Sequence, residues 1–192
     1  MNKGILVVYA GASGVGKGTI MKKLLCADPN IRLSVSATTR APRAGEVDGR
    51  EYYFVTRERF KELIDEDGFL EYAEYVGNCY GTPKKPVYDM IDQGLDVFLE
   101  IEIKGFLQIK ERCPECVSIF IIPPSFEELK LRLEGRGTES PEVIAERLRT
   151  AEEELGHSHL FDYVVVNDDV DRAANEVLDI IRRIKSNNSK EI

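Results

Sequence analysis

Short apolar runs rich in β-branched residues recur along the chain. Nearly continuous runs of this length suit strands that are buried on both faces of a sheet. Five of them are expected to form strands: Ile5–Tyr9, Leu33–Ser36, Val97–Ile103, Val117–Ile122 and Tyr163–Val166. Helical patterns lie between or after them, at Lys17–Leu25, Lys104–Arg112, Phe126–Leu133 and Arg172–Lys185. This alternation predicts an α/β core with a five-stranded, mainly parallel sheet.

One long stretch interrupts the alternation early in the chain. Residues 36–86 are polar and rich in arginine and tyrosine, and their strand-like pieces, such as Tyr52–Val55 and Phe69–Val76, are short. This composition predicts a subdomain inserted into the core.

A second interruption covers residues 125–155. It begins with Ser125 and Glu128, which have the spacing of a helix capping box. A glycine-containing segment, Gly135–Pro141, then leads into a helix that is expected to run to about Leu155, because proline suits the first helical position. We therefore expect a mobile helical lid. Residues 1–35, 87–124 and 156–185 remain for the core of one domain spanning 1–192, and the tail 186–192 is expected to be disordered.

Composition supports an ordinary globular protein and excludes two classes of partner. The 192 residues are 43% apolar and 31% charged, which is enough for one domain with a real core. The net charge of -8 argues against nucleic-acid binding, because an acidic surface repels the phosphate backbone. No apolar run approaches the ~18 residues of a membrane span, and the N-terminus lacks a secretory signal pattern. We therefore expect no membrane partner and a cytoplasmic location.

The four cysteines predict reduced thiols more than a disulfide framework. Cys113 and Cys116 have metal-ligand or redox spacing, but neither a second pair nor a nearby histidine completes a four-ligand zinc site. Their role stays open.

A glycine-rich loop between the first strand and the first helix is the strongest chemical signal. Glycines there let backbone N–H groups converge on phosphates, while the helix N-terminus and a lysine add positive charge. A tight turn with a surface lysine is the alternative, which the strand-loop-helix context disfavours. The sequence therefore predicts a nucleoside triphosphate site at Gly11, Ala12, Ser13, Gly14, Val15, Gly16, Lys17, Gly18 and Thr19.

One position in this loop departs from the usual pattern. Gly18 follows Lys17, where a serine or threonine commonly supplies a hydroxyl to magnesium, and the hydroxyl comes one residue later at Thr19. Phosphoryl transfer from a triphosphate still requires Mg²⁺ to neutralise charge. We therefore expect Mg²⁺ to be held largely by the phosphates and water, with Thr19 as a possible direct ligand.

A second anion site is predicted in the polar insertion. Arg40 and Arg43 lie three residues apart, and Pro42 disfavours a helical conformation for Ala41. Guanidinium groups match phosphate oxygens bidentately, and tyrosine hydroxyls such as those of Tyr52 and Tyr80 can add donors. A solvated basic loop is the alternative.

At this point the sequence resembles the guanylate kinases across nearly its full length. The matching segments are Gly-Ala-Ser-Gly-Val-Gly-Lys-Gly-Thr from Gly11, Val-Ser-Ala-Thr-Thr-Arg-Ala-Pro-Arg-Ala-Gly-Glu from Val35, Gly-Arg-Glu-Tyr-Tyr-Phe from Gly49, Phe-Leu-Glu-Tyr-Ala from Phe69, Tyr-Gly-Thr from Tyr80, Arg-Leu-Glu-Gly-Arg-Gly-Thr from Arg132 and Val-Val-Val-Asn-Asp-Asp from Val164. The resemblance implies a P-loop kinase with a core, a GMP-binding subdomain and a lid, which transfers the γ-phosphate of ATP to GMP. It also implies a place in purine nucleotide metabolism and GMP recycling.

The resemblance assigns the GMP site. Arg40, Arg43, Tyr52 and Tyr80 would hold the GMP phosphate, and Ser36, Glu71, Thr82 and Glu102 would contact guanine. The chemistry of the base agrees: guanine presents two donors, N1–H and the 2-amino group, which one carboxylate can accept, while a hydroxyl donates to O6. Adenine offers the opposite pattern. We expect dGMP to be accepted as well.

Two positions depart from the family pattern. Glu102 stands where the family more often has Asp, and Lys104 where it more often has Gln. The longer side chain of Glu102 can reach the base or the metal differently, so its role is less defined than that of Glu71. Glu100, at the end of the same expected strand, is a candidate for ordering magnesium-bound water. Solvation of both acids at the strand end is the alternative.

The ATP side extends beyond the phosphate loop. Arg132 and Arg136 stand four residues apart, and Arg147 falls in the following helix. The resemblance implies that these three arginines meet ATP and the transferring group, and that Asn167 contacts adenine. Arg149 is expected to make surface ion pairs only. In-line transfer without a covalent intermediate would then depend on the charges of Lys17, Arg40, Arg136 and Arg147.

Two other functions remain to be weighed against a GMP kinase. A guanylate-kinase-like interaction module would keep the acceptor pocket for peptides, but such domains typically lack an intact phosphate loop. A kinase for another phosphorylated acceptor, such as a ribose bisphosphate, would not need the guanine contacts of Ser36, Glu71 and Thr82. The sequence leaves the oligomeric state open between a monomer and a homo-oligomer.

Overall fold

A computed structural model describes residues 3–135 and 140–188 of the chain. The chain folds as two compact units. The first comprises residues up to Val8 together with Arg32–Cys116, and the second comprises Tyr9–Ile31 together with the chain from Val117 onward. No helix among the described residues combines the length and the apolar character that a bilayer crossing requires.

The larger of two sheets carries the strands predicted for the core. Its five strands follow the order β2-β7-β1-β8-β9, and β8 pairs with β9 in parallel from Ile119↔Tyr163 to Ile122↔Val166. The predicted α/β class with a five-stranded sheet is thus confirmed. The strands span Leu6–Gly11 (β1), Ile31–Leu33 (β2), Asp96–Glu100 (β7), Val117–Ile122 (β8) and Tyr163–Val166 (β9).

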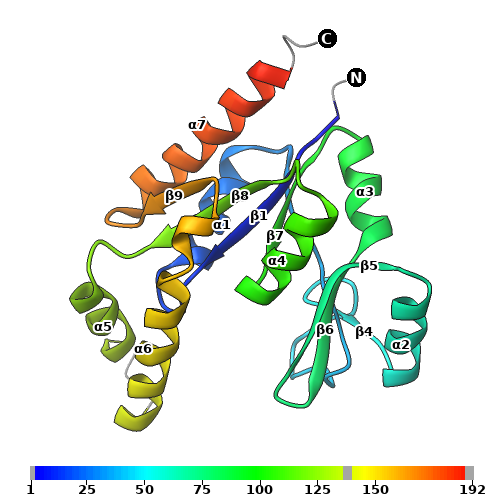
Figure 1. Ribbon diagram of the computed structural model, residues 1–192, viewed down its shortest axis with the longest axis horizontal. Coiled ribbons are helices and arrows are strands. Elements are labelled where there is room, and N and C mark those ends of the chain that lie inside the picture. Colours follow the sequence, from blue (N-terminus) through cyan, green and yellow to red (C-terminus); the bar gives the residue numbers. More distant parts are fainter. Residues whose placement is uncertain (1–2, 136–139, 189–192) are drawn as a thin grey trace. The chain divides into compact units, whose positions relative to one another are not determined.

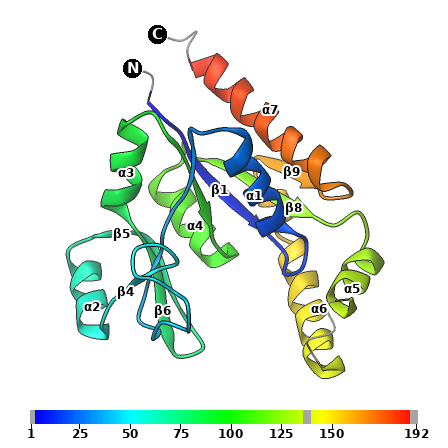
Figure 2. The same cartoon turned by 180° about the vertical axis from the view of Figure 1, so that it is seen from behind.

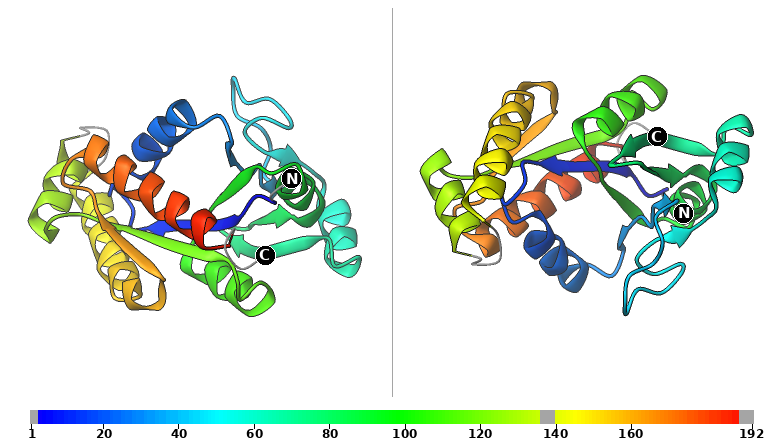
Figure 3. Two further views of the ribbon diagram at one scale, coloured as in Figure 1. Left: turned by 90° about the horizontal axis from the view of Figure 1, so that it is seen from above. Right: turned by 90° about the horizontal axis from the view of Figure 1, so that it is seen from below.

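Helices follow the strands of this sheet. In the second unit, α7 packs against α1 and β9, and α5 lies beside α6, as the different views show (Figures 1 and 3). Ser125 caps α5 and Ser140 caps α6 by accepting a backbone N–H, and Pro141 opens α6. The helices span Lys17–Ala27 (α1), Lys84–Asp92 (α3), Ile103–Arg112 (α4), Phe126–Glu134 (α5), Pro141–Leu155 (α6) and Val170–Asn188 (α7), with a 3-10 turn at Ser158–Leu160 (η1).

The smaller sheet forms most of the predicted insertion. Its order is β4-β3-β6-β5, with β3 parallel to β4 and antiparallel to β6, and with β5 antiparallel to β6. Helix α2 lies beside this sheet (Figure 2). Its Phe60 stacks on Phe69 in a cluster with the buried Ala37. The elements are Ala37–Thr38 (β3), Tyr53–Phe54 (β4), Arg57–Asp65 (α2), Phe69–Tyr75 (β5) and Asn78–Pro83 (β6).

Some elements differ from the prediction, among them β2, α2, α3 and α7. Strand β2 ends at Leu33, where the apolar pattern predicted that a strand begins. Helix α2 was not predicted, and neither was α3, which crosses the expected boundary of the insertion at residue 86. At the C-terminus, α7 continues through residues 186–188, the first part of the segment expected to be disordered. The predicted boundaries of β8, β9 and α6 match the structure.

The hairpin between β5 and β6 contains a strained residue. Tyr75 pairs with Asn78, which leaves a two-residue turn of Val76 and Gly77 with φ values of 46° and 72°. Such turns favour Asn-Gly, because a β-branched residue is poorly tolerated at positive φ. The side chain of Val76 is 80% exposed, so it contributes little packing that would offset this strain.

Replacing Val76 with asparagine should therefore stabilise the protein by about 1 kcal/mol. The midpoint of thermal unfolding is compared between Val76→Asn and Val47→Asn, because Val47 is a half-exposed valine without a positive φ. Equal changes in the two variants would show that backbone strain at Val76 is not the cause.

Candidate functional site

The loop between β1 and α1 has the shape of an anion site. Gly16 precedes α1 with φ 94° and ψ 17°, a left-handed conformation, and a Cβ at this position would lie 2.5 Å from Asn167 Nδ2. Both facts require glycine. The first residues of α1 leave their N–H groups directed out of the helix, where they can meet phosphate oxygens.

Lys17 lies across this loop. Its Nζ donates hydrogen bonds to Gly11 O at 2.6 Å and Ala12 O at 3.2 Å. The ammonium group is therefore held against the backbone that surrounds the expected phosphate position. Thr19, two residues on, is exposed in the first turn of α1, and Gly18 has open space where a Cβ would stand. A residue with a side chain would therefore fit at position 18.

Asn167 supports the loop from the end of β9. It is 2% exposed, and its Nδ2 donates to Val15 O at 2.7 Å. Its Oδ1 is buried, with no hydrogen-bond partner among the described residues. Because only a donor can face the Val15 carbonyl, the amide orientation is fixed, and an acceptor is left over.

Two of the three predicted lid arginines lie in the described chain, and both reach the phosphate-loop region. Arg132 donates to Glu128 Oε1 at 3.0 Å and to Asn167 O at 2.9 Å. Arg147 Nη2 donates to Ser13 Oγ at 2.8 Å. Arg136 lies outside the described residues. Arg149 is exposed.

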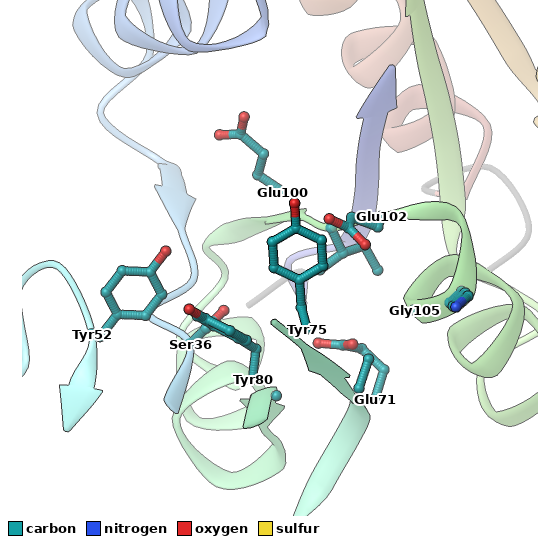
Figure 4. Close-up of a pocket in the computed structure, with 12 residues that line it drawn as sticks. Ser36, Tyr52, Glu71, Tyr75, Tyr80, Glu100, Glu102 and Gly105 are labelled. Carbon is teal, nitrogen blue, oxygen red and sulfur yellow. The ribbon is translucent and has the colours of Figure 1, made fainter. Parts of the chain in front are cut away.

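The first unit holds a pocket of about 310 Å³ (Figure 4). Its lining combines residues from the smaller sheet with residues that follow β7. Five residues predicted for the GMP site line it: Ser36, Tyr52, Glu71, Tyr80 and Glu102. Glu100, predicted to order magnesium-bound water, lines it as well. Tyr75 and Gly105 also line it, and the sequence had singled out neither.

Glu71 is the chemically distinctive group of this pocket. It is 6% exposed, and it faces Thr82 across β5 and β6, where Thr82 Oγ1 donates to its Oε1 at 2.6 Å. Burial raises the pKa of Glu71, hydrogen bonds from Thr82 partly oppose the rise, and the nearby Glu102 charge adds to it. Thr82 thus acts on the pocket by holding Glu71, although it does not line the pocket itself.

Gly105 gives the Glu71 carboxylate its space. A Cβ on Gly105 would lie 2.7 Å from Glu71 Oε2 and 3.2 Å from its Cδ. Gly105 belongs to α4, and Gln108 one turn later fixes α4 to β5 by bonding both Tyr72 N and Tyr72 O, at 3.2 and 2.9 Å. Neither α4 nor β5 can move away without breaking these hydrogen bonds. The position of the Glu71 carboxylate therefore requires that residue 105 has no side chain.

Replacing Gly105 with alanine should displace the Glu71 carboxylate and raise the KM for the acceptor nucleotide. The expected rise is on the order of 10- to 100-fold, the cost of a shift of about 1 Å in a binding group. Steady-state kinetics with Gly105→Ala and with Leu107→Ala, a half-exposed position in the same helix, would measure it. An unchanged KM in Gly105→Ala would show that the absence of a side chain at position 105 does not affect binding of the acceptor nucleotide.

Arg40 lies beside this pocket with its charge already paired. Its Nη2 donates to both Glu46 oxygens, at 2.9 and 3.0 Å, and its guanidinium stands 5.4 Å from the centre of the Tyr52 ring. The pKa of Glu46 is lowered, first by the Arg40 side chain and next by the backbone N–H of Arg43, and the pKa of Arg40 is raised by Glu46. The side chain of Arg43 is exposed.

The structure also qualifies the remaining predictions. Glu100 and Glu102 are exposed, and Glu102 is the N-cap residue of α4 without a side-chain capping bond. No group of three or more His, Cys, Asp or Glu side chains in the described ranges is arranged to hold a metal ion. Cys113 and Cys116 are buried and reduced, and Cys113 Sγ lies 3.4 Å from the hydroxyl of Tyr88.

A glycine-rich loop that joins a core strand to a helix, with a lysine directed at it, defines a P-loop nucleotide-binding protein of the α/β class. The sequence profile of the guanylate kinase family, described as "Guanylate kinase", matches residues 3–184. The chain therefore belongs to the guanylate kinase family, which confirms the resemblance.

Individual relatives agree over most of their length. The guanylate kinase of Lactococcus lactis is 54% identical over 93% of this chain and 87% of the relative, and that of one Thermus thermophilus strain is 55% identical over 93% and 81%. The crystal structure of guanylate kinase from Anaplasma phagocytophilum superposes with a TM-score of 0.74 at 38% identity, covering 96% of this chain and 87% of that one.

Proposed function

We propose that this chain transfers the γ-phosphate of ATP to GMP, and to dGMP, releasing ADP and the nucleoside diphosphate. The observation that carries the proposal is the buried carboxylate of Glu71 in the acceptor pocket, held by Thr82. This activity would belong to purine nucleotide metabolism and GMP recycling in the cytoplasm.

Base recognition would follow from Glu71. An ionised carboxylate accepts from both N1–H and the 2-amino group of guanine, and Ser36, in the same pocket, supplies a hydroxyl for O6. Adenine has neither of these two donors in that arrangement, and a buried carboxylate left unpaired is costly. The pocket would therefore reject AMP.

The acceptor phosphate would be held by Arg40, Arg43, Tyr52 and Tyr80. The rings of Tyr52 and Tyr80 stand 6.0 Å apart edge to face, and both tyrosines line the pocket. Glu46 already satisfies the guanidinium of Arg40 with two oxygens, as a phosphate would do. We infer that the GMP phosphate competes with Glu46 for Arg40 when the nucleotide binds.

The phosphates of ATP would bind the loop from Gly11 to Thr19, with Lys17 near the transferring group. Arg147 and Arg132, already at the loop region, would turn to ATP, and Arg136 would join them from the segment outside the described residues. The unpaired Oδ1 of Asn167 supports an adenine contact, since the 6-amino group of adenine is a donor.

In the reaction, a phosphate oxygen of GMP would attack the γ-phosphorus of ATP in line. One P–O bond forms as the bond to the ADP oxygen breaks. No general base is needed, because a phosphate monoester oxygen is already ionised, and hence a competent nucleophile, near neutral pH. Lys17, Arg40, Arg136 and Arg147 would stabilise the charge on the transferring oxygens. Mg²⁺, when bound, supplies further neutralisation of the β- and γ-phosphates. Thr19 and Glu100 would hold it, the latter through water, since oxygen ligands suit this ion.

A single assay separates this activity from the alternatives. ADP release is measured with ATP, Mg²⁺ and one of GMP, dGMP, AMP, CMP, UMP or a ribose bisphosphate. We expect turnover with GMP and dGMP only. Turnover with AMP or the ribose bisphosphate instead would refute the base assignment, and ATP binding without turnover on any acceptor would favour an interaction module.

A further inference from the structure

Ser13 in the phosphate loop is held by two side chains of α6. Its backbone N–H donates to Glu154 Oε2 at 3.1 Å, and its hydroxyl accepts from Arg147 Nη2 at 2.8 Å. Arg147 and Glu154 are seven residues apart, which is two helical turns, so both project from one face of α6. Figure 2 shows α6 beside the loop that joins β1 to α1.

This face of α6 is fixed by packing. Ala151, between Arg147 and Glu154 on the same stripe, is 0% exposed, whereas the neighbouring Glu153 is exposed. Glu154 therefore has a defined position from which to accept the Ser13 N–H. It stands one residue before Leu155, where α6 ends, away from the segment that precedes the helix.

The peptide unit between Ala12 and Ser13 is held at both of its polar groups, the carbonyl and the N–H. The N–H of Ser13 and the carbonyl of Ala12 belong to the same planar peptide and point in opposite directions. Glu154 accepts from the N–H, and Lys17 Nζ donates to the carbonyl at 3.2 Å. If this peptide rotates, the Ala12 oxygen turns away and Lys17 loses one of the two loop carbonyls that orient it.

We propose that Glu154 is a positioning residue for Lys17: it sets the plane of the Ala12–Ser13 peptide, and this plane orients the lysine toward the phosphates of ATP. The inference extends the proposed function, because it assigns a role on the ATP side to a carboxylate that does not itself contact the nucleotide.

The test compares Glu154→Ala, Glu154→Gln and the neighbouring control Glu153→Ala. ATP affinity is measured by calorimetry, and kcat and both KM values by the ADP-release assay, at a temperature where thermal melts show every variant folded. For Glu154→Ala we expect about tenfold weaker ATP binding and a lower kcat, with the KM for GMP unchanged. Glu154→Gln should recover much of the loss, because its amide oxygen still accepts from Ser13.

A double-variant cycle shows whether the effect acts through the lysine. In a Lys17→Ala background, adding Glu154→Ala should not weaken ATP binding further, because the group being oriented is already gone. Additive losses would overturn the proposal, and so would ATP affinity equal to that of Glu153→Ala or tighter binding in Glu154→Ala. If the unmodified chain binds ATP but phosphorylates no acceptor, the proposed function fails, while the affinity measurements still decide the role of Glu154.

Discussion

Lys17→Ala should lower kcat for ADP release by about a hundredfold or more while leaving the fold intact. The Nζ group rests on two loop carbonyls at 2.6 and 3.2 Å, so it is already oriented before a nucleotide arrives and needs no reorganisation during transfer. Its charge would act where negative charge spreads over the moving phosphoryl oxygens. Steady-state kinetics at saturating GMP, with ATP varied, measures the loss.

The matched control is Lys22→Ala, which removes an exposed lysine of the same helix. This control should keep normal kinetics, and both variants should keep normal GMP affinity. A kcat for Lys17→Ala within a few-fold of the control would contradict the role of Lys17 in transfer, even if ATP binding were weaker.

Glu71→Gln should reduce kcat/KM for GMP by about 10²- to 10⁴-fold, since each of two hydrogen bonds to a charged group contributes about 1.5–3 kcal/mol. The substituted amide keeps an oxygen for Thr82 but turns an NH₂ toward the two guanine donors. ATP affinity should not change. Glu74→Gln, an exposed acid on the same strand, is the control. Equal losses for GMP and ATP would argue against base recognition by Glu71.

The pH dependence gives the same residue a second test. Burial raises the pKa of Glu71 above its ordinary value of 4.5, and only the ionised form accepts both guanine donors. The KM for GMP should therefore rise as the pH falls through the raised pKa, and this dependence should be absent in Glu71→Gln.

The stability of the nucleotide-free protein should depend on pH in the opposite direction to GMP binding, because Glu71 destabilises the fold when it is ionised. A carboxyl whose pKa is raised on folding stabilises the folded state only when protonated, and this contribution is lost as the pH rises from 4.5 through the folded value. Without nucleotide, Glu71→Gln should therefore unfold at a higher temperature than the unmodified chain at neutral pH. The difference should disappear below pH 4.5, and thermal melts at the two pH values check it.

The core was predictable from sequence where burial alone decides the structure. Strand β8 is apolar apart from Ser118 and is followed by Pro123, and strand β9 is an apolar run between Asp162 and Asn167, so the pattern predicts where both strands lie. The pattern failed at residues 33–36, where apolar and polar residues alternate as in a strand. The backbone of this segment instead bonds in two directions, with Ser34 N donating to Phe98 O and Ser36 O accepting from Tyr53 N. Helix α2 buries only Phe60, which is too weak a signal inside a polar insertion.

The residues of the candidate site also fall into those that could be predicted from the sequence and those that could not. Lys17 and Arg40 could be predicted because their chemistry and spacing are visible within short segments, whereas Glu71 was predicted from the resemblance to the guanylate kinases. Gly105 and Glu154 could not, because each depends on a contact between distant parts of the chain: Glu154 is 141 residues from Ser13. Glu46 carried a usable signal, since an acid three residues after Arg43 can pair with either neighbouring arginine.

The phosphate loop depends on Asn167, a residue that is synthesised much later than the loop itself. The residue that supports Val15 and closes over Gly16 is added to the growing chain 152 residues after Val15. On the ribosome, this loop therefore emerges long before the residue that completes its surroundings. A nascent chain would therefore lack this support for the loop until the end of β9 is in place, and α7, which packs on α1, is added later still.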